Sequence, residues 1–504
     1  MALLFNRIRL KDFVKVPVRY RHGPDHWSVI KKKKTPKDKA LEHFDEFYGS
    51  VYGNSWEEIR AALLKEETKY IAVVNNFSDV DKTRSNLELL GALHLKSVYD
   101  VQKEWLNDRL KSKEHIKNTE SQNKCNPMET VIRNTQMTEV ASLYPPENQG
   151  ALQALKSEKE KDESIQKSDS LQPIRLQSIE EDLNDVSIDT SRVVDSSVDV
   201  STLHEFVPPT KIKGLDEWIL ESEHYKFYSK AADFKIDIVK ESVLPFPEHL
   251  HPYTFGVQDN SAFPGPKKGS TGVLDYYLFD GASILPVLAL DIQAGDVVLD
   301  MCAAPGGKTL TIIQTLMPSI LVANDFKESR VQRIYNIMEQ YLSNVYEKEK
   351  MWFVTEQDAR AIEEKDVYNK ILVDVPCTTD RHVLHSDDNN IFKPTRIKER
   401  LKIPEVQSEI LANALRLVSV GGTVVYSTCS LSPVQNDGVV QVALKKTWEE
   451  TDSVMVVKDM TEALSPLQSL FKFANIELKY GHIAVPTLKN NWGPMYFCKI
   501  VRVR

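Results

Sequence analysis

Short apolar runs alternate with amphipathic segments along the C-terminal half of the chain. Runs of this length that are apolar throughout are typical of buried parallel strands, and apolar residues at helical spacing separate them. The expected strands are 297–299, 320–323, 351–354, 370–377 and 423–429, with later ones at 455–457, 482–485 and 495–501. The expected helices are 309–316, 331–341 and 406–418, the last of them stopped by Gly421 and Gly422. The repeated β-α order predicts an α/β fold with a doubly wound, Rossmann-like sheet.

The N-terminal half has a different pattern. Apolar residues recur at helical spacing over 35–111, around an expected strand at 70–74 and a further helix that includes Leu87, Leu90 and Leu93. Residues 112–205 are rich in Ser, Lys, Glu, Asp and Asn, a composition that buries too little apolar surface to fold, so we expect a disordered insertion. Residues 206–290 form a connecting region, with an expected helix near 276–290. The catalytic domain is expected over 291–504.

Aromatic and lysine residues interleave at 218–235 in the connecting region. Aromatic rings stack on bases and lysines attract phosphates, so this stretch is a candidate contact for single-stranded RNA. The alternative is an ordinary core with a solvated rim.

The stretch D-V-V-L-D-M-C-A-A-P-G-G-K-T at 296–309 joins an expected strand to an expected helix through small residues. Such loops let a cofactor approach the backbone at a helix N-terminus. A phosphate-binding P-loop would need glycine at the position of Cys302. A site for S-adenosylmethionine (SAM) is favoured instead, because Asp325 follows the next strand, about 20 residues later, where a ribose is held in dinucleotide-type folds.

Charge, cysteine content and the absence of long apolar runs indicate where the protein resides and which kinds of site it lacks. The 504 residues carry a formal net charge of −8, and the five cysteines show no metal-ligand spacing, which fits free thiols in a reducing compartment. No apolar run reaches the roughly 18 residues of a membrane helix, so we expect no membrane association. Residues 1–34 are basic and acid-poor, which is typical of a mitochondrial transit segment. The run Lys31–Lys34 also fits an RNA-binding arm or a nuclear signal.

Cys377 and Cys429 each close an expected strand at the same edge of the sheet. A buried structural role is one explanation. A metal site with His382 and His385 is another, but neither histidine has the spacing of a helical ligand pair, so we expect no metal. Covalent catalysis is the third. A thiolate that adds to carbon 6 of cytosine makes carbon 5 nucleophilic toward the SAM methyl group, an acid near N3 assists, and loss of the carbon-5 proton expels the thiolate.

The stretches D-M-C-A-A-P-G-G-K-T, D-V-P-C-T-T-D-R-H and Y-S-T-C-S-L-S closely resemble the Nol/Nop/Sun-domain family of RNA cytosine-C5 methyltransferases. The match extends over 272–504, and within the family P-C-T-T-D-R-H is similar to the mitochondrial ribosomal-RNA member. Weaker similarity to that member lies at 44–48 and 72–77, whereas the insertion at 112–205 departs from the compact form.

The resemblance implies a class I SAM-dependent methyltransferase with Cys429 as the nucleophile on carbon 6. Cys377 assists release of the methylated RNA, and Asp374 lies between SAM and the base, where it pairs with N3. The implied SAM-binding residues are Gly306, Gly307, Lys308, Asp325, Arg330, Asp358, Ala359 and Asp374. Among these, Asp325 binds the ribose and Asp358 lies near the adenine. Ala359 stands where the family commonly has glycine.

The resemblance also implies a substrate, a place and a partner. The substrate is the ribosomal RNA of the mitochondrial small subunit, in the matrix, in support of ribosome assembly. The partner is a helical-repeat protein of the mitochondrial transcription termination factor type, in a heterodimer. Two alternatives remain open from the residues: a SAM-binding assembly factor with a mainly structural role, and a P-loop nucleotide hydrolase.

Overall fold

The computed structural model describes residues 34–122, 236–257, 259, 261–342, 351–476 and 478–504. The described residues divide into two units, one of 34–103 with 236–504 and the other of 104–122. The predicted transit segment up to residue 33, the insertion from residue 123 onward and the aromatic–basic stretch at 218–235 lie outside the described residues.

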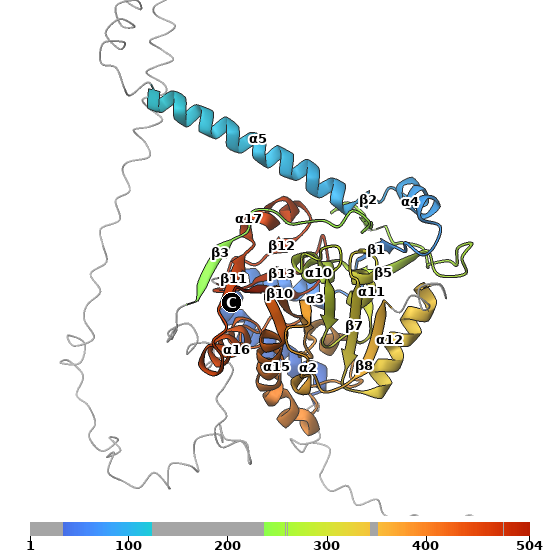
Figure 1. The fold of residues 1–504 in the computed structure, drawn as a ribbon, viewed down its shortest axis with the longest axis vertical. Helices are drawn as coiled ribbons and strands as arrows, with labels where there is room; N and C mark the ends of the chain where they lie inside the picture. Colours follow the sequence, from blue (N-terminus) through green and yellow to red (C-terminus); the bar gives the residue numbers. More distant parts are fainter. Residues whose placement is uncertain (1–33, 123–235, 258, 260, 343–350, 477) are drawn as a thin grey trace, which may run out of the picture. The chain divides into compact units, whose positions relative to one another are not determined.

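A sheet of ten strands organises the larger unit (Figure 1). Along it the order is β12-β13-β14-β10-β9-β6-β7-β8, and β11 pairs with β14 and with β3. The parallel strands are β6 (Val297–Asp300), β7 (Ile320–Asp325), β8 (Trp352–Glu356), β9 (Tyr368–Asp374) and β10 (Val418–Thr428). The remaining strands are β3 (Asp237–Lys240), β11 (Met455–Asp459), β12 (Lys472–Phe473), β13 (His482–Val485) and β14 (Met495–Arg502).

The strand order confirms the predicted doubly wound fold. Strand β6 lies between β7 and β9, so the chain moves outward in one direction through β7 and β8 and then in the other through β9 and β10. Sheets of this kind bind ligands beside the carboxyl ends of the strands, where the order reverses. Asp300 and Asp374 close β6 and β9, the two strands at that point.

Alternate residues of the central strands enter two different hydrophobic cores, because side chains of a strand point to opposite faces. Val298 and Leu372 pack with helices α10 (Ile284–Ala289), α11 (Gly307–Ile313) and α12 (Glu328–Tyr341). Leu299 and Ile371 pack on the other face with α15 (Ile397–Leu417) and α16 (Asp437–Glu450). Helices therefore cover both faces, which accounts for the apolar character of these strands.

The predicted end of the helix before β10 is wrong. Helix α15 ends at Leu417, and Gly421 and Gly422 lie inside β10. A Cβ atom at Gly422 would lie 2.8 Å from the carbonyl oxygen of Asn369. The glycine is therefore needed for the close approach of two backbones rather than for ending a helix.

A second, antiparallel sheet has the order β2-β4-β1-β5. Its strands are β1 (Tyr70–Val74), β2 (Leu93–His94), β4 (Pro252–Thr254) and β5 (Tyr276–Asp280). Strand β1 is confirmed, whereas the helix predicted over 276–290 is wrong: β5 is followed by the 3-10 turn η5 (Gly281–Ser283) and the short α10. This sheet takes two strands from 35–111 and two from 206–290, which we predicted as separate regions.

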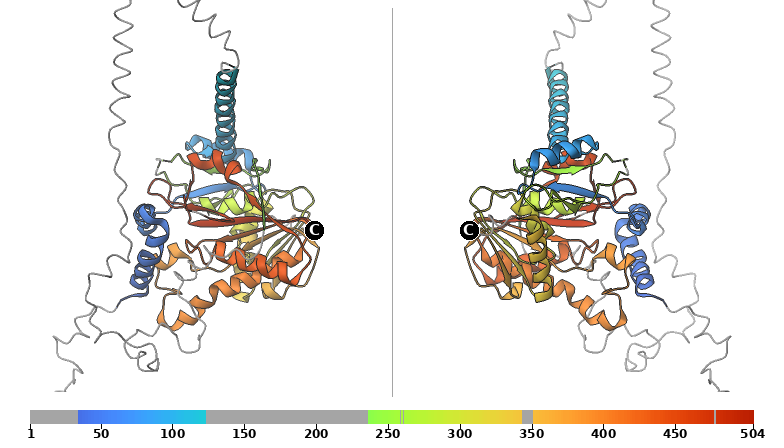
Figure 2. Two further views of the ribbon diagram at one scale, coloured as in Figure 1. Left: turned by 90° about the vertical axis from the view of Figure 1, so that its left-hand side faces the viewer. Right: turned by 90° about the vertical axis from the view of Figure 1, so that its right-hand side faces the viewer.

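Two N-terminal helices, α2 (Pro36–Tyr52) and α3 (Trp56–Leu64), pack on the core of the larger unit. Thr35 caps α2, with its hydroxyl accepting from the Asp38 N–H and the Asp38 carboxylate accepting from the Thr35 N–H. The buried face of α2 carries Phe44 and Tyr48, which join the core that contains α15. Figure 2 shows these blue helices beside the orange part of the chain.

Two predicted boundaries in the N-terminal half are displaced. Helix α4 (Val80–Leu89) ends before Leu90, and Leu93 begins β2, so the three leucines do not share one helix. Helix α5 (Leu95–Gln122) continues past residue 111, so the predicted start of the insertion falls inside a helix. No helix among the described residues is long and apolar enough to cross a membrane.

Candidate active site

The loop between β6 and α11 is tied to the neighbouring strand by its backbone. The Ala303 N–H donates to the Asn324 carbonyl at 2.8 Å, and the Arg330 guanidinium donates to the Ala304 carbonyl at 2.9 Å. Gly306 has a φ of +114°, which favours glycine, and α11 begins directly after it. The loop therefore presents the N-terminus of α11 at the switch point, as the sequence predicts.

A cavity of about 580 Å³ lies beside this loop, at the carboxyl ends of the parallel strands. Its volume falls in the usual range for a small-molecule site. Of the residues predicted for the site, it is lined by Asp325, Arg330, Asp358, Ala359 and Cys377. Apolar walls come from Ile403, Val406 and Ile410 of α15. The other predicted residues, which are Gly306, Gly307, Lys308, Asp374 and Cys429, do not line this cavity.

Two carboxylates on the cavity wall, those of Asp325 and Asp358, are oriented by arginines. Asp325 is 4% exposed at its side chain and accepts from the Ala304 N–H at 3.2 Å and from Arg330 Nε at 2.8 Å. A carboxylate has about four acceptor positions, so Asp325 keeps some for a ribose diol. Asp358 accepts from Arg360 at 2.7 Å, and this hydrogen bond holds the pKa of Asp358 below its usual value.

Ala359 lies in the short turn η6 (Ala359–Ala361) and is 5% exposed. Its carbonyl accepts a hydrogen bond from Asn413 Nδ2 at 2.8 Å, and Asn413 also binds the Ile362 carbonyl. The turn is thus anchored to α15. Ala359, which stands where the family commonly has glycine, lines the cavity.

Lys308 and Asp374 form a partly buried ion pair, with Nζ 2.7 Å from Oδ2. Burial lowers the pKa of Lys308, but the charge and hydrogen bond of Asp374 outweigh it, so the pKa is raised above its usual value. The other oxygen of Asp374 accepts from Ser427 Oγ at 2.7 Å. Lys308 is therefore a fixed cation, and it aims the Asp374 carboxylate toward the cysteine loops.

Asp300 lies deeper, 1% exposed, and accepts from Thr309 Oγ1 at 2.6 Å. Burial raises the pKa of Asp300 to about 7, with the negative charge of Asp374 adding to the effect and the hydrogen bond from Thr309 opposing it.

Cys377 and Cys429 lie side by side, with their Sγ atoms 2.8 Å apart, and both are free thiols. The hydrogen bond with Cys377 raises the pKa of Cys429 well above its usual value, and burial and the carboxylates of Asp374 and Asp380 add to the effect. Cys429 is therefore a protonated thiol at neutral pH until a group nearby accepts its proton. The sequence prediction that both cysteines meet at one edge is confirmed.

The histidines near Cys377 turn away from the thiols. His382 Nε2 lies 3.4 Å from the Asp388 carbonyl, and His385 Nε2 lies 2.7 Å from the Leu63 carbonyl. Within the described parts of the chain, no group of three His, Cys, Asp or Glu side chains is placed to hold a metal ion. Cys498, predicted to be a core residue, is fully buried.

Sequence reasoning missed Asp380, a fully buried carboxyl group that contacts both cysteine loops. It stands three residues after Cys377, at the start of α14 (Asp380–His385). An acidic residue at a helix start is usually an exposed cap, so the sequence alone offers no sign of burial.

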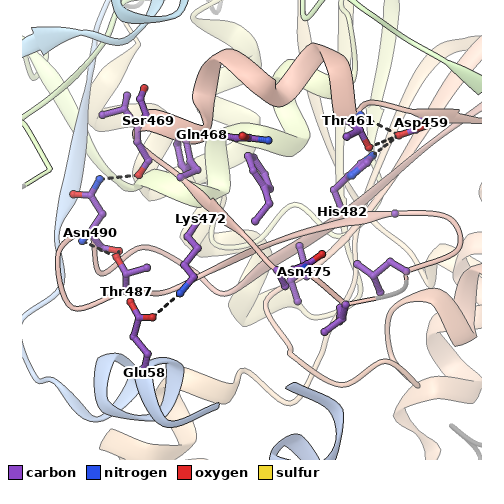
Figure 3. Close-up of a pocket in the computed structure, with 18 of the residues that line it drawn as sticks. Glu58, Asp459, Thr461, Gln468, Ser469, Lys472, Asn475, His482, Thr487 and Asn490 are labelled. Carbon is purple, nitrogen blue, oxygen red and sulfur yellow. Dashed lines mark hydrogen bonds and ion pairs between the residues drawn. The ribbon is translucent and has the colours of Figure 1, made fainter. Parts of the chain in front are cut away.

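Another cavity, of about 910 Å³, lies elsewhere, along β12 and β13 (Figure 3). An ion pair between Lys472 and Glu58 spans one end of it, and Asp459 and His482 lie at the other. None of the predicted site residues lines it. The chemistry of the molecule is therefore associated with the smaller cavity beside the glycine loop.

Comparison with known proteins identifies the family. A family model described as 16S rRNA methyltransferase RsmB/F matches residues 287–474. A 5-cytosine rRNA methyltransferase of Caenorhabditis elegans is 33% identical over 501 residues, which cover 98% of each chain. A protein of the same description from Mus musculus is 32% identical over 98% of this chain and 97% of its own. The chain belongs to the family of 5-cytosine rRNA methyltransferases.

This family membership decides the activity class. The enzyme is a SAM-dependent RNA cytosine-C5 methyltransferase that acts on ribosomal RNA, and its fold is that of the class I SAM-dependent methyltransferases. Similarity extends further to a mitochondrial tRNA (cytosine(34)-C(5))-methyltransferase of Danio rerio, 33% identical over 56% of this chain and 72% of that protein. The P-loop hydrolase alternative is excluded by the family.

The residues present fit SAM. The cavity beside the glycine loop offers carboxylates for hydroxyl and amino groups and an aliphatic wall for a purine ring. The buried Asp325 retains acceptor capacity, and Gly307 is packed so tightly that a Cβ atom there would lie 2.9 Å from the Tyr277 hydroxyl. A larger residue at Gly307 would press on the rings of Tyr277 and Phe279.

Proposed function

We propose that this enzyme methylates the small-subunit ribosomal RNA of mitochondria through a covalent cysteine–cytosine intermediate, and that it supports assembly of that subunit. The observation that carries the chemistry is the pair of free thiols, Cys377 and Cys429, whose Sγ atoms lie 2.8 Å apart beside a cofactor-sized cavity. Covalent catalysis needs a nucleophile, and a second thiol in contact with it is placed to assist its release.

In the proposed mechanism Cys429 is the nucleophile. Its raised pKa keeps the thiol protonated while the base is absent, so the proton must leave when the base arrives. Sγ then bonds to carbon 6 of cytosine, electrons move from the C5–C6 double bond toward N3, and the thiol proton passes through the Asp374 carboxylate to N3. Asp374, fixed by Lys308 and Ser427, lies near enough to interact electrostatically with Cys429 and is assigned to N3 of the ring.

SAM supplies an electrophilic methyl group when it is bound, and carbon 5 of the activated ring takes it. Removal of the carbon-5 proton then restores the double bond and expels Cys429. Cys377 is assigned to this release, because its Sγ is in hydrogen-bond contact with the departing sulfur. Each thiol therefore has a role that the other cannot replace.

We assign cofactor binding to the residues around the glycine loop. Gly306, Gly307 and Lys308 support the loop, and Asp325 binds the ribose with Arg330 holding its carboxylate in place. Asp358 and Ala359 flank the adenine end of the cavity, where Arg360 and Asn413 hold the turn.

The mitochondrial assignment rests on three supports. Residues 1–34 are basic and acid-poor in sequence, the motifs resemble those of the mitochondrial ribosomal-RNA member, and one relative is named as mitochondrial. The same resemblance supports the partner, a helical-repeat protein of the mitochondrial transcription termination factor type that supplies additional RNA affinity. A SAM-binding assembly factor with a mainly structural role stays the alternative for the cellular task.

The test mixes the wild type, Cys429→Ala and Cys377→Ala with SAM, the helical-repeat partner and ribosomal RNA, followed by a denaturing gel. We expect protein to remain bound to RNA with Cys377→Ala, whereas Cys429→Ala should neither bind covalently nor methylate. Exchange of the two outcomes would reverse the assignment of the cysteines. RNA binding without methyl transfer by any of the three proteins, while SAM binds, would favour the assembly-factor alternative.

Localisation needs its own experiment. A fusion of residues 1–34 to a fluorescent reporter should direct it to mitochondria, and a full chain lacking these residues should remain outside. Nuclear accumulation of the fusion would instead support the basic run at Lys31–Lys34 as a nuclear signal.

A further inference from the structure

The carboxyl group of Asp380 joins the two loops that carry the cysteines. It is 0% exposed. Thr378, which directly follows Cys377, donates from its hydroxyl to Oδ1 at 2.5 Å. The backbone N–H of Leu431, two residues after Cys429, donates to Oδ2 at 2.7 Å. One carboxylate therefore connects the residues that flank each thiol.

Further side chains complete the connection. Ser430 Oγ lies 3.2 Å from both oxygens of Asp380 and 3.0 Å from Thr378 Oγ1. Gln435 accepts from the Thr378 N–H at 3.1 Å and donates to its hydroxyl at 3.2 Å. Because these groups are buried, each hydrogen bond lost would leave a polar atom unsatisfied, so the network favours one arrangement of the loops.

A third segment of the chain reaches the same carboxyl group. Tyr48 of α2 donates its hydroxyl to Asp380 Oδ2 at 2.8 Å, and Tyr52 donates to the Leu431 carbonyl at 2.8 Å. Both tyrosines are buried, and the Tyr48 ring stacks on Phe44 with centroids 4.7 Å apart. Helix α2 thus holds one side of the cysteine loops, although it lies more than 300 positions away in sequence.

The backbone between Cys377 and Asp380 is strained. Thr379 has a φ of +53° and a ψ of +60°, a left-handed conformation that is rare for a β-branched residue. Such conformations are unfavourable and persist where surrounding contacts impose them. Thr378 and Asp380, on either side of Thr379, supply those contacts.

We propose that Asp380 is a positioning residue for methyl transfer, and that Tyr48 and Tyr52 make helix α2 part of the same device. These contacts fix the separation of the Cys377 and Cys429 thiols. Cys429 must reach the base, and Cys377 must stay near the Cys429 sulfur when that sulfur leaves the ring. This inference rests on the roles proposed for the two cysteines.

The first test is kinetic and uses the full chain with SAM and a transcript of the small-subunit ribosomal RNA. Asp380→Asn should lower kcat about 100-fold and Tyr48→Phe about 10-fold, because small displacements of reacting groups are costly. The KM for SAM should stay within twofold. In a Cys377→Ala background the same changes should slow formation of the covalent RNA adduct by similar factors.

Asp437 offers a matched control. It is also a buried carboxyl group that accepts from a tyrosine hydroxyl, that of Tyr496, and from backbone N–H groups, but these belong to Lys479, Tyr480 and Gly481. Asp437→Asn should keep kcat within threefold of the wild type. An equal loss in Asp437→Asn and Asp380→Asn would mean that any buried carboxyl change disables the enzyme, and would overturn the proposal.

The second test needs neither RNA nor methyl transfer. Diamide takes two electrons and two protons from a thiol pair, which closes to a disulfide while the azo group becomes a hydrazine. Cys377 and Cys429 should cross-link at least fivefold more slowly in Asp380→Asn and Tyr48→Phe than in the wild type, measured by mass after blocking of free thiols. Unchanged cross-linking together with unchanged kcat would refute the positioning role.

The two tests distinguish failure of the proposed function from failure of the positioning role. If the wild type transfers no methyl group to the transcript, the proposed substrate is wrong, and the cross-linking rates still decide the positioning role. If Asp380→Asn does not fold, Tyr48→Phe decides both measurements, because it removes one hydroxyl and leaves the ring packed on Phe44.

Discussion

Asp300 should make the stability of the enzyme depend on pH in an unusual direction. Its pKa is raised from 3.8 to about 7 because the carboxyl group is buried, with Asp374 opposing its ionisation and Lys308 and Thr309 favouring it. Between about pH 4 and pH 7 the folded protein therefore keeps a proton on Asp300 that the unfolded chain releases. The free energy of unfolding must fall as pH rises through this window.

The magnitude follows from the size of the pKa difference. Roughly three pH units at 1.36 kcal/mol each amount to at most about 4 kcal/mol between pH 4 and pH 8. Asp300→Asn removes the titration and keeps the size of the side chain. The variant should therefore gain stability relative to the wild type as pH rises, with most of the gain above about pH 5.

Urea unfolding of both proteins from pH 4 to pH 8, followed by tryptophan fluorescence, measures this difference. Thr309→Val removes the hydrogen bond to Asp300 Oδ2 and should move the midpoint of the pH effect upward, because that bond favours the ionised form. A difference between wild type and Asp300→Asn that stays constant within about 0.5 kcal/mol across the range would refute the reasoning. A downward shift in Thr309→Val would contradict the assigned cause.

Four further changes test other parts of the structure. Lys308→Met should lower the free energy of unfolding by about 3 kcal/mol in urea titrations, because it leaves the Asp374 carboxylate without its cation. Adding Asp374→Asn should restore at least about 1 kcal/mol. No recovery in the double variant would contradict a direct pair. Arg330→Ala should weaken SAM binding about tenfold by calorimetry, since it frees the Asp325 carboxylate, and unchanged affinity would remove Arg330 from the site. Gly422→Ala should cost about 1–3 kcal/mol in thermal unfolding, because its Cβ would meet backbone oxygens, and a neutral effect would show that β9 and β10 can separate. Phe44→Ala should cost about 3–5 kcal/mol by the same measurement, and a cost below about 1 kcal/mol would mean that α2 contributes little to the core.

The half of the site that holds the cofactor could be predicted from the sequence because it is local. Strand β6, the small-residue loop and α11 follow one another directly, and Asp325 ends the next strand. Each parallel strand is buried on both faces, so it stands out as an apolar run, and the polar residue at its end marks the ligand edge. The small-residue loop that contains Gly306 could be predicted for the same reason.

The rest depended on contacts that sequence patterns do not record. The run Tyr276–Phe279 is apolar throughout, which fits a helix or a strand equally, and only its pairing with β1 decides the matter. That partner lies about 200 positions earlier in the chain. Gly422 was interpreted as a helix stop because nothing in the sequence shows that Asn369 lies against it.

The active site therefore has two halves that the chain builds in different ways. The cofactor half comes from consecutive elements between β6 and η6, whose loops are held by Arg330 and Asn413. The thiol half is held by side chains from α2, from the start of α14 and from the loop after β10, through the carboxyl group of Asp380. The loop of Cys377 and Thr378 also lines the cofactor cavity, but the other partners of Asp380, which are Tyr48, Ser430 and Leu431, lie outside that lining. A change in α2 should then alter the rate of the chemistry while leaving cofactor affinity in place, and this makes an N-terminal helix without catalytic groups part of the catalytic apparatus.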